Sequence, residues 1–249
     1  KMKAFYKWGT NPFYYLAGKY SIHPTYIQEM LSQKIDDSKI LKIINQLKNG
    51  LGKKYDINLI RSEFQKPIKI INGNWTPKKK FKSKEILFLA SGDSLINNKK
   101  SIENYIKKTK PLVIALKPKI KFNYKLINYY IACNPLRIMA ESSTYNNLKK
   151  PLIIPQSLMP DTLKKKFNKV QTLNFGAGLK QNNFNFKNNG AIIPKFYTLS
   201  YALAVATSGC SKKILLAGFD GYGKNDQRTK VIDNIFDIYK KNKKSLSIT

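Results

Sequence analysis

Short runs, apolar at every position except in the run at 170–175, alternate with helical patterns from residue 85 onward, and this alternation restricts the fold more than any other feature of the chain. The runs cover residues 86–90, 112–116, 129–133, 152–154, 170–175 and 214–217. A helical stretch dense in small residues lies at 197–206, before the last run. Strands that are apolar at every position are typical of parallel sheets covered on both faces. The sequence therefore predicts an α/β fold, a mostly parallel sheet with helices on both faces.

The chain before this pattern is organised differently. Residues 1–65 show helical spacing, with Pro24 in a first helical turn and Asn49-Gly50 ending a later helix. Residues 66–81 are rich in proline, glycine and lysine and are predicted to be a linker. Residues 82–249 form the sheet domain. Since residues 246–249 begin another strand, we expect the chain to be truncated at its C-terminus, as a fragment of a longer protein.

The charge of the chain is extreme. It contains 46 Lys and Arg against 14 Asp and Glu, a formal net charge of +32, and arginine stands only at positions 61, 137 and 228. Such an excess suggests nucleic acid or an anionic membrane surface as a partner. The lysines, however, are scattered among many Asn and Ile, a composition that an A/T-rich genome also produces. Phosphate-reading surfaces favour arginine, so nucleic acid is the weaker alternative.

Several site types are excluded by residue counts. Two cysteines, Cys133 and Cys210, build neither a disulfide framework nor a zinc site. The single histidine, His23, precedes the linker, so the sequence indicates neither a Ser/His/Asp triad nor a metal site. No apolar run approaches the roughly 20 residues of a membrane span, and no signal peptide opens the chain. We expect a basic, cytoplasmic protein without a transmembrane segment.

Two glycine-bearing turns follow apolar runs and are the main candidate ligand-binding segments. The first contains Ser91, Gly92, Asp93 and Ser94, and the second contains Gly218, Asp220 and Tyr222. In an open α/β sheet, ligands bind where such turns leave the carboxyl ends of the strands. Asp220 is the candidate base and acceptor of hydrogen bonds from a sugar. The alternative is that both segments are plain turns, in which Asp93, Ser94 or Asp220 caps a helix.

Four further residues are candidates for the same crevice. Asn134 and Arg137 follow the third run, where Arg137 binds either an anion or a structural carboxylate. Thr198 and Ser200 lie near the start of the small-residue helix, where N-capping explains them equally well.

Two segments resemble known families. Residues 8–31, with Trp8-Gly9-Thr10-Asn11-Pro12 and Leu16-Ala17-Gly18, resemble the segment after the barrel of 4-hydroxy-2-oxovalerate aldolase-like proteins (HMG-CoA lyase-like) of bacterial surface-polysaccharide genes. The barrel that carries the aldolase chemistry is absent. Residues 85–249 resemble the domain that follows it, and more distantly a bacterial sialyltransferase family with a Rossmann-like nucleotide-sugar domain.

The second resemblance rests on Ala90-Ser91-Gly92-Asp93-Ser94-Leu95 and on the stretch from Tyr197 to Tyr222. Asp93 replaces the family's proline, and no histidine follows His23 to match the catalytic one. The resemblance thus implies nucleotide-sugar binding, of the CMP-sugar type, more strongly than glycosyl transfer.

We therefore expect a Rossmann-like domain that binds a nucleotide or nucleotide sugar in bacterial lipopolysaccharide or O-antigen biosynthesis. It would be part of a bifunctional, glycosyltransferase-like enzyme with the aldolase module as its partner. Two alternatives stay open: a non-catalytic docking domain of an aldolase-like lyase, and a non-specific nucleic-acid binder.

Overall fold

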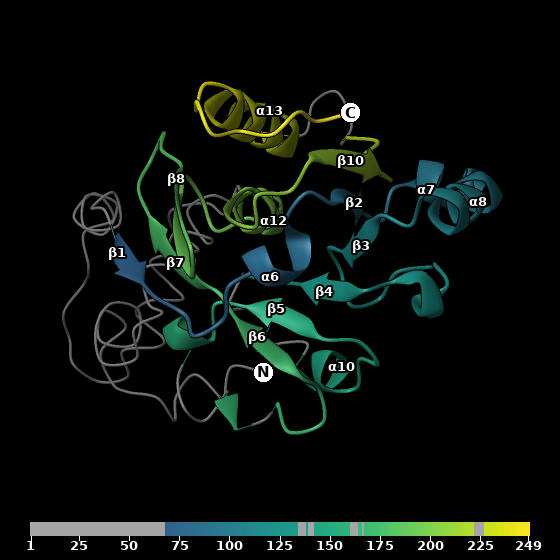
Figure 1. The fold of residues 1–249 in the computed structure, drawn as a ribbon, viewed down its shortest axis with the longest axis horizontal. Helices are drawn as coiled ribbons and strands as arrows, with labels where there is room; N and C mark the ends of the chain where they lie inside the picture. The colour runs from purple at the N-terminus through teal and green to yellow at the C-terminus, as the bar shows by residue number, and fades with distance from the viewer. Residues whose placement is uncertain (1–67, 134–137, 139–141, 160–163, 166, 222–226) are drawn as a thin grey trace, which may run out of the picture.

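A computed structural model describes residues 68–133, 138, 142–159, 164–165, 167–221 and 227–249 (Figure 1). Six strands form one all-parallel sheet in the order β10-β2-β3-β4-β5-β6, which confirms the predicted α/β fold. The helical segment predicted for residues 1–65 lies outside the described residues. The strands of the sheet are β2 (Glu85–Leu89), β3 (Leu112–Ala115), β4 (Tyr129–Ile131), β5 (Leu152–Ile154), β6 (Thr172–Asn174) and β10 (Lys213–Ala217).

Helices cover both faces of this sheet, as the fully apolar strands predict. Successive residues of β2 enter opposite cores: Ile86 packs with one face and Leu87 with the other, and both are buried. The Leu87 side is covered by α7 (Asp93–Asn97), α8 (Lys99–Thr109) and α10 (Ser142–Asn146). The Ile86 side is covered by α12 (Thr198–Ser208) and α13 (Gln227–Lys240).

A second, four-stranded sheet lies beyond α12 and is not predicted by the sequence. Its order is β1-β7-β9-β8, with β1 at Ile68–Ile71, β7 at Gly176–Leu179, β9 at Gly190–Ile193 and β8 at Asn185–Lys187. Gly176 is required there because a Cβ atom would stand 2.1 Å from the carbonyl oxygen of Ile71. Glycine in a strand interior allows such a close backbone approach.

Helix α12 is enclosed between the two sheets. It packs on β8 and β9, and every residue from Leu199 to Ser208 is buried. Ala202, Ala204 and Ala206 let the backbones on either side come close. The small side chains of the 197–206 stretch are thus explained by packing.

The described part of the predicted linker, residues 68–81, is not a solvated spacer. It contains β1 and the short helix α6 (Lys78–Phe81), whose lysines are exposed while Phe81 is completely buried. The ring of Phe81 meets Trp75 edge-on, with centroids 5.9 Å apart. Of the described residues that suggested a linker, Lys78, Lys79 and Lys80 are exposed, whereas Pro77 is buried and a Cβ atom on Gly73 would stand 1.9 Å from the Asn174 carbonyl oxygen, so this segment is packed against the rest of the fold.

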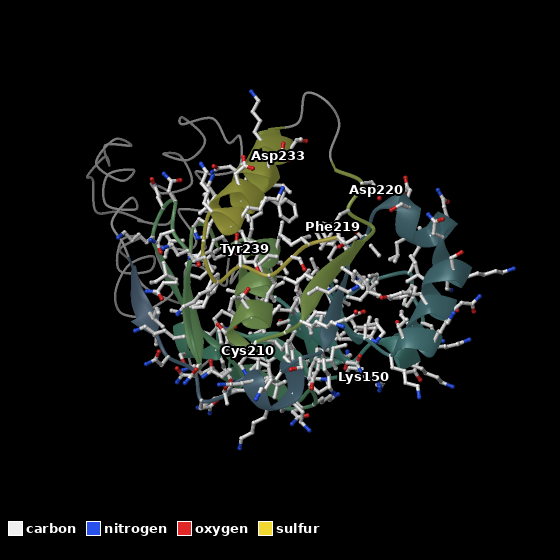
Figure 2. The ribbon with its side chains drawn as sticks, turned by 45° about the horizontal axis from the view of Figure 1, so that its top comes forward. Lys150, Cys210, Phe219, Asp220, Asp233 and Tyr239 are labelled. Atoms are coloured by element: carbon white, nitrogen blue, oxygen red, sulfur yellow. The ribbon has the colours of Figure 1, made fainter. Side chains whose placement is uncertain are left out.

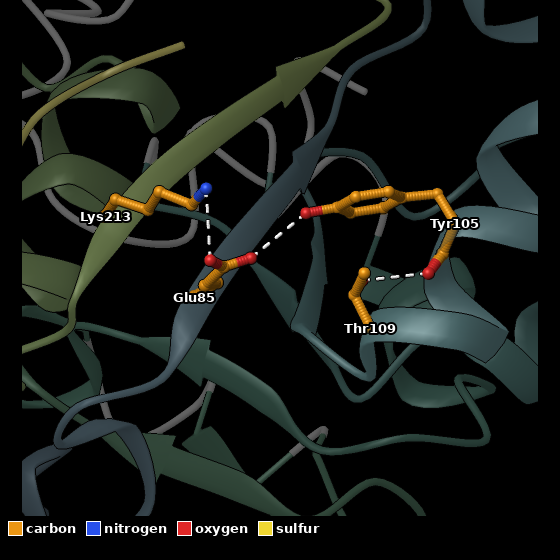
Figure 3. A network of polar contacts seen from close by, with 4 residues as sticks. All are labelled: Glu85, Tyr105, Thr109 and Lys213. Atoms are coloured by element: carbon orange, nitrogen blue, oxygen red, sulfur yellow. Dashed lines mark hydrogen bonds and ion pairs between the residues drawn. The ribbon is translucent and has the colours of Figure 1, made fainter.

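A polar network joins the starts of β2 and β10 to α8 (Figure 3). Lys213 Nζ lies 3.1 Å from Glu85 Oε1, and the Tyr105 hydroxyl donates to Glu85 Oε2 at 3.0 Å. Thr109 Oγ1 in turn donates to the Tyr105 carbonyl at 2.9 Å. The hydrogen bond from Lys213 is the largest influence on the pKa of Glu85, which is lowered from its ordinary value.

The last residues extend the sheet beside β10, as predicted for residues 246–249. Ile248 pairs with Ile214 in a parallel bridge, and the Leu216 N–H donates to the Thr249 carbonyl at 2.9 Å. Two short 3-10 turns complete the described elements, η1 (Tyr124–Leu126) before β4 and η2 (Gln156–Leu158) after β5.

Candidate functional site

The strand order reverses at β2, and this places the candidate site. The chain passes from β2 to β3 on one side and returns with β10 on the other, with Leu89 in register with Ala217. In open α/β sheets, ligands bind at the carboxyl ends of the two strands that flank such a reversal. The two predicted turns, residues 91–94 and 218–223, leave β2 and β10 at this point, and residues 218–221 of the second are described.

The two turns are fastened to each other by backbone hydrogen bonds. The Gly92 N–H donates to the Gly218 carbonyl, and the Ala90 N–H to the Ala217 carbonyl, both at 2.9 Å. Gly218 has φ +76°, and a Cβ atom there would stand 2.7 Å from the Ala90 carbonyl oxygen. A Cβ on Gly92 would stand 2.5 Å from Asp220 Cγ. Both glycines are therefore needed for the close packing of these turns.

Asp220 binds across the reversal to the first turn of α7 (Figure 2). Its Oδ2 accepts the Ser94 N–H at 2.7 Å, and its Oδ1 accepts the Ser94 hydroxyl. These hydrogen bonds, that of the hydroxyl first, hold the pKa of Asp220 below its ordinary value. A lowered pKa makes a carboxylate a weaker proton acceptor, so the geometry favours Asp220 as a hydrogen-bond acceptor over a general base.

In the turn at residues 91–94, the donors of Ser94 that could bind an anion already bind the carboxylate of Asp220. The Ser94 N–H, which a phosphate in this crevice could otherwise bind, already has a negatively charged partner in Asp220. Ser91 and Asp93 are exposed beside this contact.

The start of α12 offers a second group of polar atoms toward the same edge of the sheet. Helix α12 ends beside Phe81 and leads into the start of β10, so it runs opposite to β10. Eleven residues of helix span roughly 16 Å, about the length of a five-residue strand. Thr198 and Ser200 therefore lie toward the carboxyl edge, where the sequence analysis expected them.

At both helix starts the N-cap residue, Gly92 or Tyr197, gives no side-chain cap. Among the described residues, a carboxylate binds the first turn of α7, through Asp220 and Ser94, and none is recorded on that of α12. The first N–H groups of an α-helix have no partner within the helix. Ser200 is completely buried, and its hydroxyl has no hydrogen-bond partner in the part of the chain that the structure describes. The Cα–Cβ bonds of a helix tilt toward its N-terminus, so the Ser200 Cβ lies on the side of the helix start.

Lys195, three residues before α12, is a residue that the sequence analysis missed. It is partly buried, and burial lowers its pKa. Within the described ranges, no carboxylate pairs with it. One lysine among so many carries no signal in the sequence, and only its burial distinguishes it.

Three predicted site residues, Asn134, Arg137 and Tyr222, lie outside the described residues. In the part of the chain that the structure describes, no group of His, Cys, Asp and Glu is arranged to hold a metal ion. Among these same residues, no helix is long and apolar enough to cross a bilayer.

Comparison with protein families, characterised proteins and solved structures gave no significant match.

Proposed function

We propose that this domain binds a nucleotide or a nucleotide sugar, of the CMP-sugar type, at the carboxyl edge of the six-stranded sheet. The strand reversal between β2 and β10 supports a ligand site at this edge. The resemblance of residues 85–249 to the domain after the aldolase barrel, and to bacterial sialyltransferases, supports a role in lipopolysaccharide or O-antigen biosynthesis. Transfer of the sugar is the less supported part, because Asp220 is a weak base and no histidine follows residue 23.

The observation that carries the proposal is the unpartnered Ser200 hydroxyl at the uncapped start of α12. A buried hydroxyl without a partner destabilises a fold by about 1–3 kcal/mol, and a ligand oxygen would remove that cost. Exposed N–H groups at a helix start favour an anion, and a phosphate supplies both acceptor atoms and charge.

Lys195 adds a cation whose desolvation has no compensating carboxylate among the described residues. A bound phosphate would restore the missing partner and raise the pKa of Lys195. We therefore assign the phosphate to Ser200, Thr198 and Lys195.

Gly92, Ser94, Gly218 and Asp220 then form the adjoining wall, with exposed Ser91 and Asp93 available to the sugar or base. Asn134, Arg137 and Tyr222 keep their predicted roles in this proposal.

The two unpartnered serines of α12 provide a matched test. Ser208 is also buried without a hydrogen-bond partner, but it lies in the last turn of the same helix. Binding of CMP, UMP, GDP and their sugars is measured by calorimetry for the wild type, Ser200→Ala, Ser208→Ala and Lys195→Gln. For the best ligand we expect about 10-fold weaker binding for Ser200→Ala and about 10-fold or more for Lys195→Gln.

Ser208→Ala should bind as the wild type does, and neither serine variant should lower the melting temperature. Equal weakening by both serine variants would assign the effect to helix packing and overturn the site. If none of these nucleotides binds, the proposal fails and a docking domain becomes the better description.

A further inference from the structure

Lysine is placed systematically at one edge of the six-stranded sheet. The four residues before each strand include a lysine in all six cases, and none of these segments contains an acidic residue. These lysines are exposed except for the partly buried Lys150. The lysines, which we call the amino-edge row, are Lys82 and Lys84, Lys108 and Lys110, Lys125, Lys149 and Lys150, Lys169, and Lys212.

The opposite edge lacks this pattern. Of the four-residue segments that follow the six strands, only the one after β3 contains lysine, at Lys117 and Lys119. At the lysine content of this chain, a four-residue window contains one or more lysines in about half of cases. Coding bias raises lysine everywhere and does not distinguish the two edges, so it does not account for the row.

The strand order gathers these residues into a cationic face at one edge of the sheet, in which Glu85 at the start of β2 is an acidic residue. Neighbouring strands lie about 4.8 Å apart, so the row from β10 to β6 extends over about 24 Å. The Lys212 N–H donates to the Lys84 carbonyl at 2.8 Å, which joins the segments before β10 and β2. The exposed Lys78, Lys79 and Lys80 of α6 add to the face. Helix α6 lies at the same edge, because the Ser83 N–H just after it donates to the Cys210 carbonyl just before β10. Figure 2 shows Cys210 and Lys150 toward this end and Asp220 at the other.

Such clustering has an electrostatic cost that scattered lysines would avoid. The backbones of neighbouring strands lie about 4.8 Å apart, less than the Debye length of about 8 Å at physiological ionic strength, so salt only partly screens charges held at neighbouring strand starts. Helix C-termini favour cations, which accounts for Lys108 near the end of α8. Lys84 and Lys212 stand directly at strand starts, where no such dipole acts on them, and the one carboxylate beside them in the described structure is Glu85, which lies close to Lys212 and is already paired with Lys213.

We infer that the amino-edge row docks the domain on an anionic phospholipid surface. A flat array of ammonium groups matches the diffuse negative charge of such a surface, to which each lysine contributes separately. The crevice at the opposite edge would then face away from the bilayer and stay open to soluble ligands. This inference does not depend on which ligand the crevice takes.

The described surface fits lipid better than nucleic acid. Proteins that hold single strands combine basic grooves with several aromatic platforms. Among the described residues, the large exposed apolar side chains are Ile96 on α7 and Tyr124 on η1. In the part of the chain that the structure describes, one exposed tyrosine is too little to stack successive bases. It suits the interfacial position that tyrosine takes on membranes.

The test compares two variants of the full chain with equal loss of charge. The row variant combines Lys84→Gln, Lys149→Gln, Lys169→Gln and Lys212→Gln. The control combines exposed lysines toward the other edge, Lys99→Gln, Lys100→Gln, Lys119→Gln and Lys121→Gln. Co-sedimentation uses vesicles of phosphatidylglycerol with phosphatidylethanolamine, and pure phosphatidylcholine for comparison, at about 150 mM salt. Circular dichroism checks that both variants fold.

We expect the wild type and the control to bind the anionic vesicles but not the phosphatidylcholine vesicles. The row variant, which lacks four lysines, should bind the anionic vesicles about 1,000-fold more weakly. Equal losses in both variants would mean that net charge, not this face, drives binding. Absence of vesicle binding by the wild type would overturn the inference. Binding to a mixed-sequence single-stranded RNA without binding to vesicles would also overturn it and reassign the face to nucleic acid.

Discussion

The closeness of the two turns at the strand reversal can be tested with a pair of glycines. Gly218 and Gly221 both have positive φ, +76° and +80°. A Cβ atom on Gly218 would meet the Ala90 carbonyl oxygen at 2.7 Å and Leu95 Cβ at 3.0 Å, whereas nothing lies within 4 Å of one on Gly221. Alanine at either position therefore meets the same backbone strain, and only Gly218→Ala also meets an obstruction.

The magnitudes follow from these two contributions. A left-handed conformation costs an L-residue about 1–2 kcal/mol, which is the full expectation for Gly221→Ala. Overpacking a tight site adds about 1–3 kcal/mol, so Gly218→Ala should lose about 3 kcal/mol in total. The unfolded-state effect of replacing glycine is the same in both variants and cancels in their difference.

Urea denaturation, followed by both circular dichroism and tryptophan fluorescence, measures the two free energies of unfolding. For a chain of this size, a difference of about 2 kcal/mol corresponds to about 4–8 °C in melting temperature. Equal destabilisation of the two variants would refute the packing of residues 218–221 against Ala90. It would also remove the basis for placing both turns in one site.

Two further outcomes are expected. Tyr239→Phe should lower the free energy of unfolding by about 1–3 kcal/mol, measured by denaturation. The buried Tyr239 hydroxyl bonds Thr207 Oγ1 at 2.6 Å and accepts the Leu246 N–H at 3.0 Å. The control Tyr124→Phe, on the surface, should not change the free energy of unfolding measurably. Acid should also weaken the fold, because folding lowers the pKa values of Glu85 and Asp220. Their charged forms stabilise the fold when the pH is above their ordinary pKa values of 4.5 and 3.8, and this stabilisation is lost as the pH falls through the lowered pKa values. A Glu85→Gln/Asp220→Asn double variant should lose less stability between pH 6 and about pH 3 than the wild type, and parallel curves would contradict the assignment.

The central sheet could be predicted because its strands need no tertiary information to be recognised. Runs such as 86–90 and 112–116 are too short for core helices and apolar at every position, which leaves a strand covered on both faces. The second sheet could not be predicted in this way. Its strands β7 and β9 both begin with glycine, and β8 alternates exposed and buried residues over only three positions. The reason for Gly176 is the backbone of Ile71, more than 100 residues earlier in the chain.

The candidate site shows the same division between local and long-range information. Glycine-bearing turns after apolar strands are visible in the sequence, and the turns at 91–94 and 218–221 do lie together. The bond from Ser94 to Asp220 depends on β10 being the neighbour of β2, and no local pattern encodes that order. Lys195 was missed because its burial, not its identity, makes it unusual.

In the proposed site, the two helix starts at the carboxyl edge would bind negative charge from different sources. At α7 the charge is supplied by Asp220, which satisfies the Ser94 N–H and fixes the β10 turn to the β2 turn. A phosphate arriving there would compete with a carboxylate that is tethered in place. At α12 no side chain caps the helix, Ser200 is unpartnered and Lys195 has no carboxylate among the described residues. An anionic ligand therefore gains most at α12, while the Asp220 contact keeps the neighbouring wall of the crevice in one conformation before the ligand arrives.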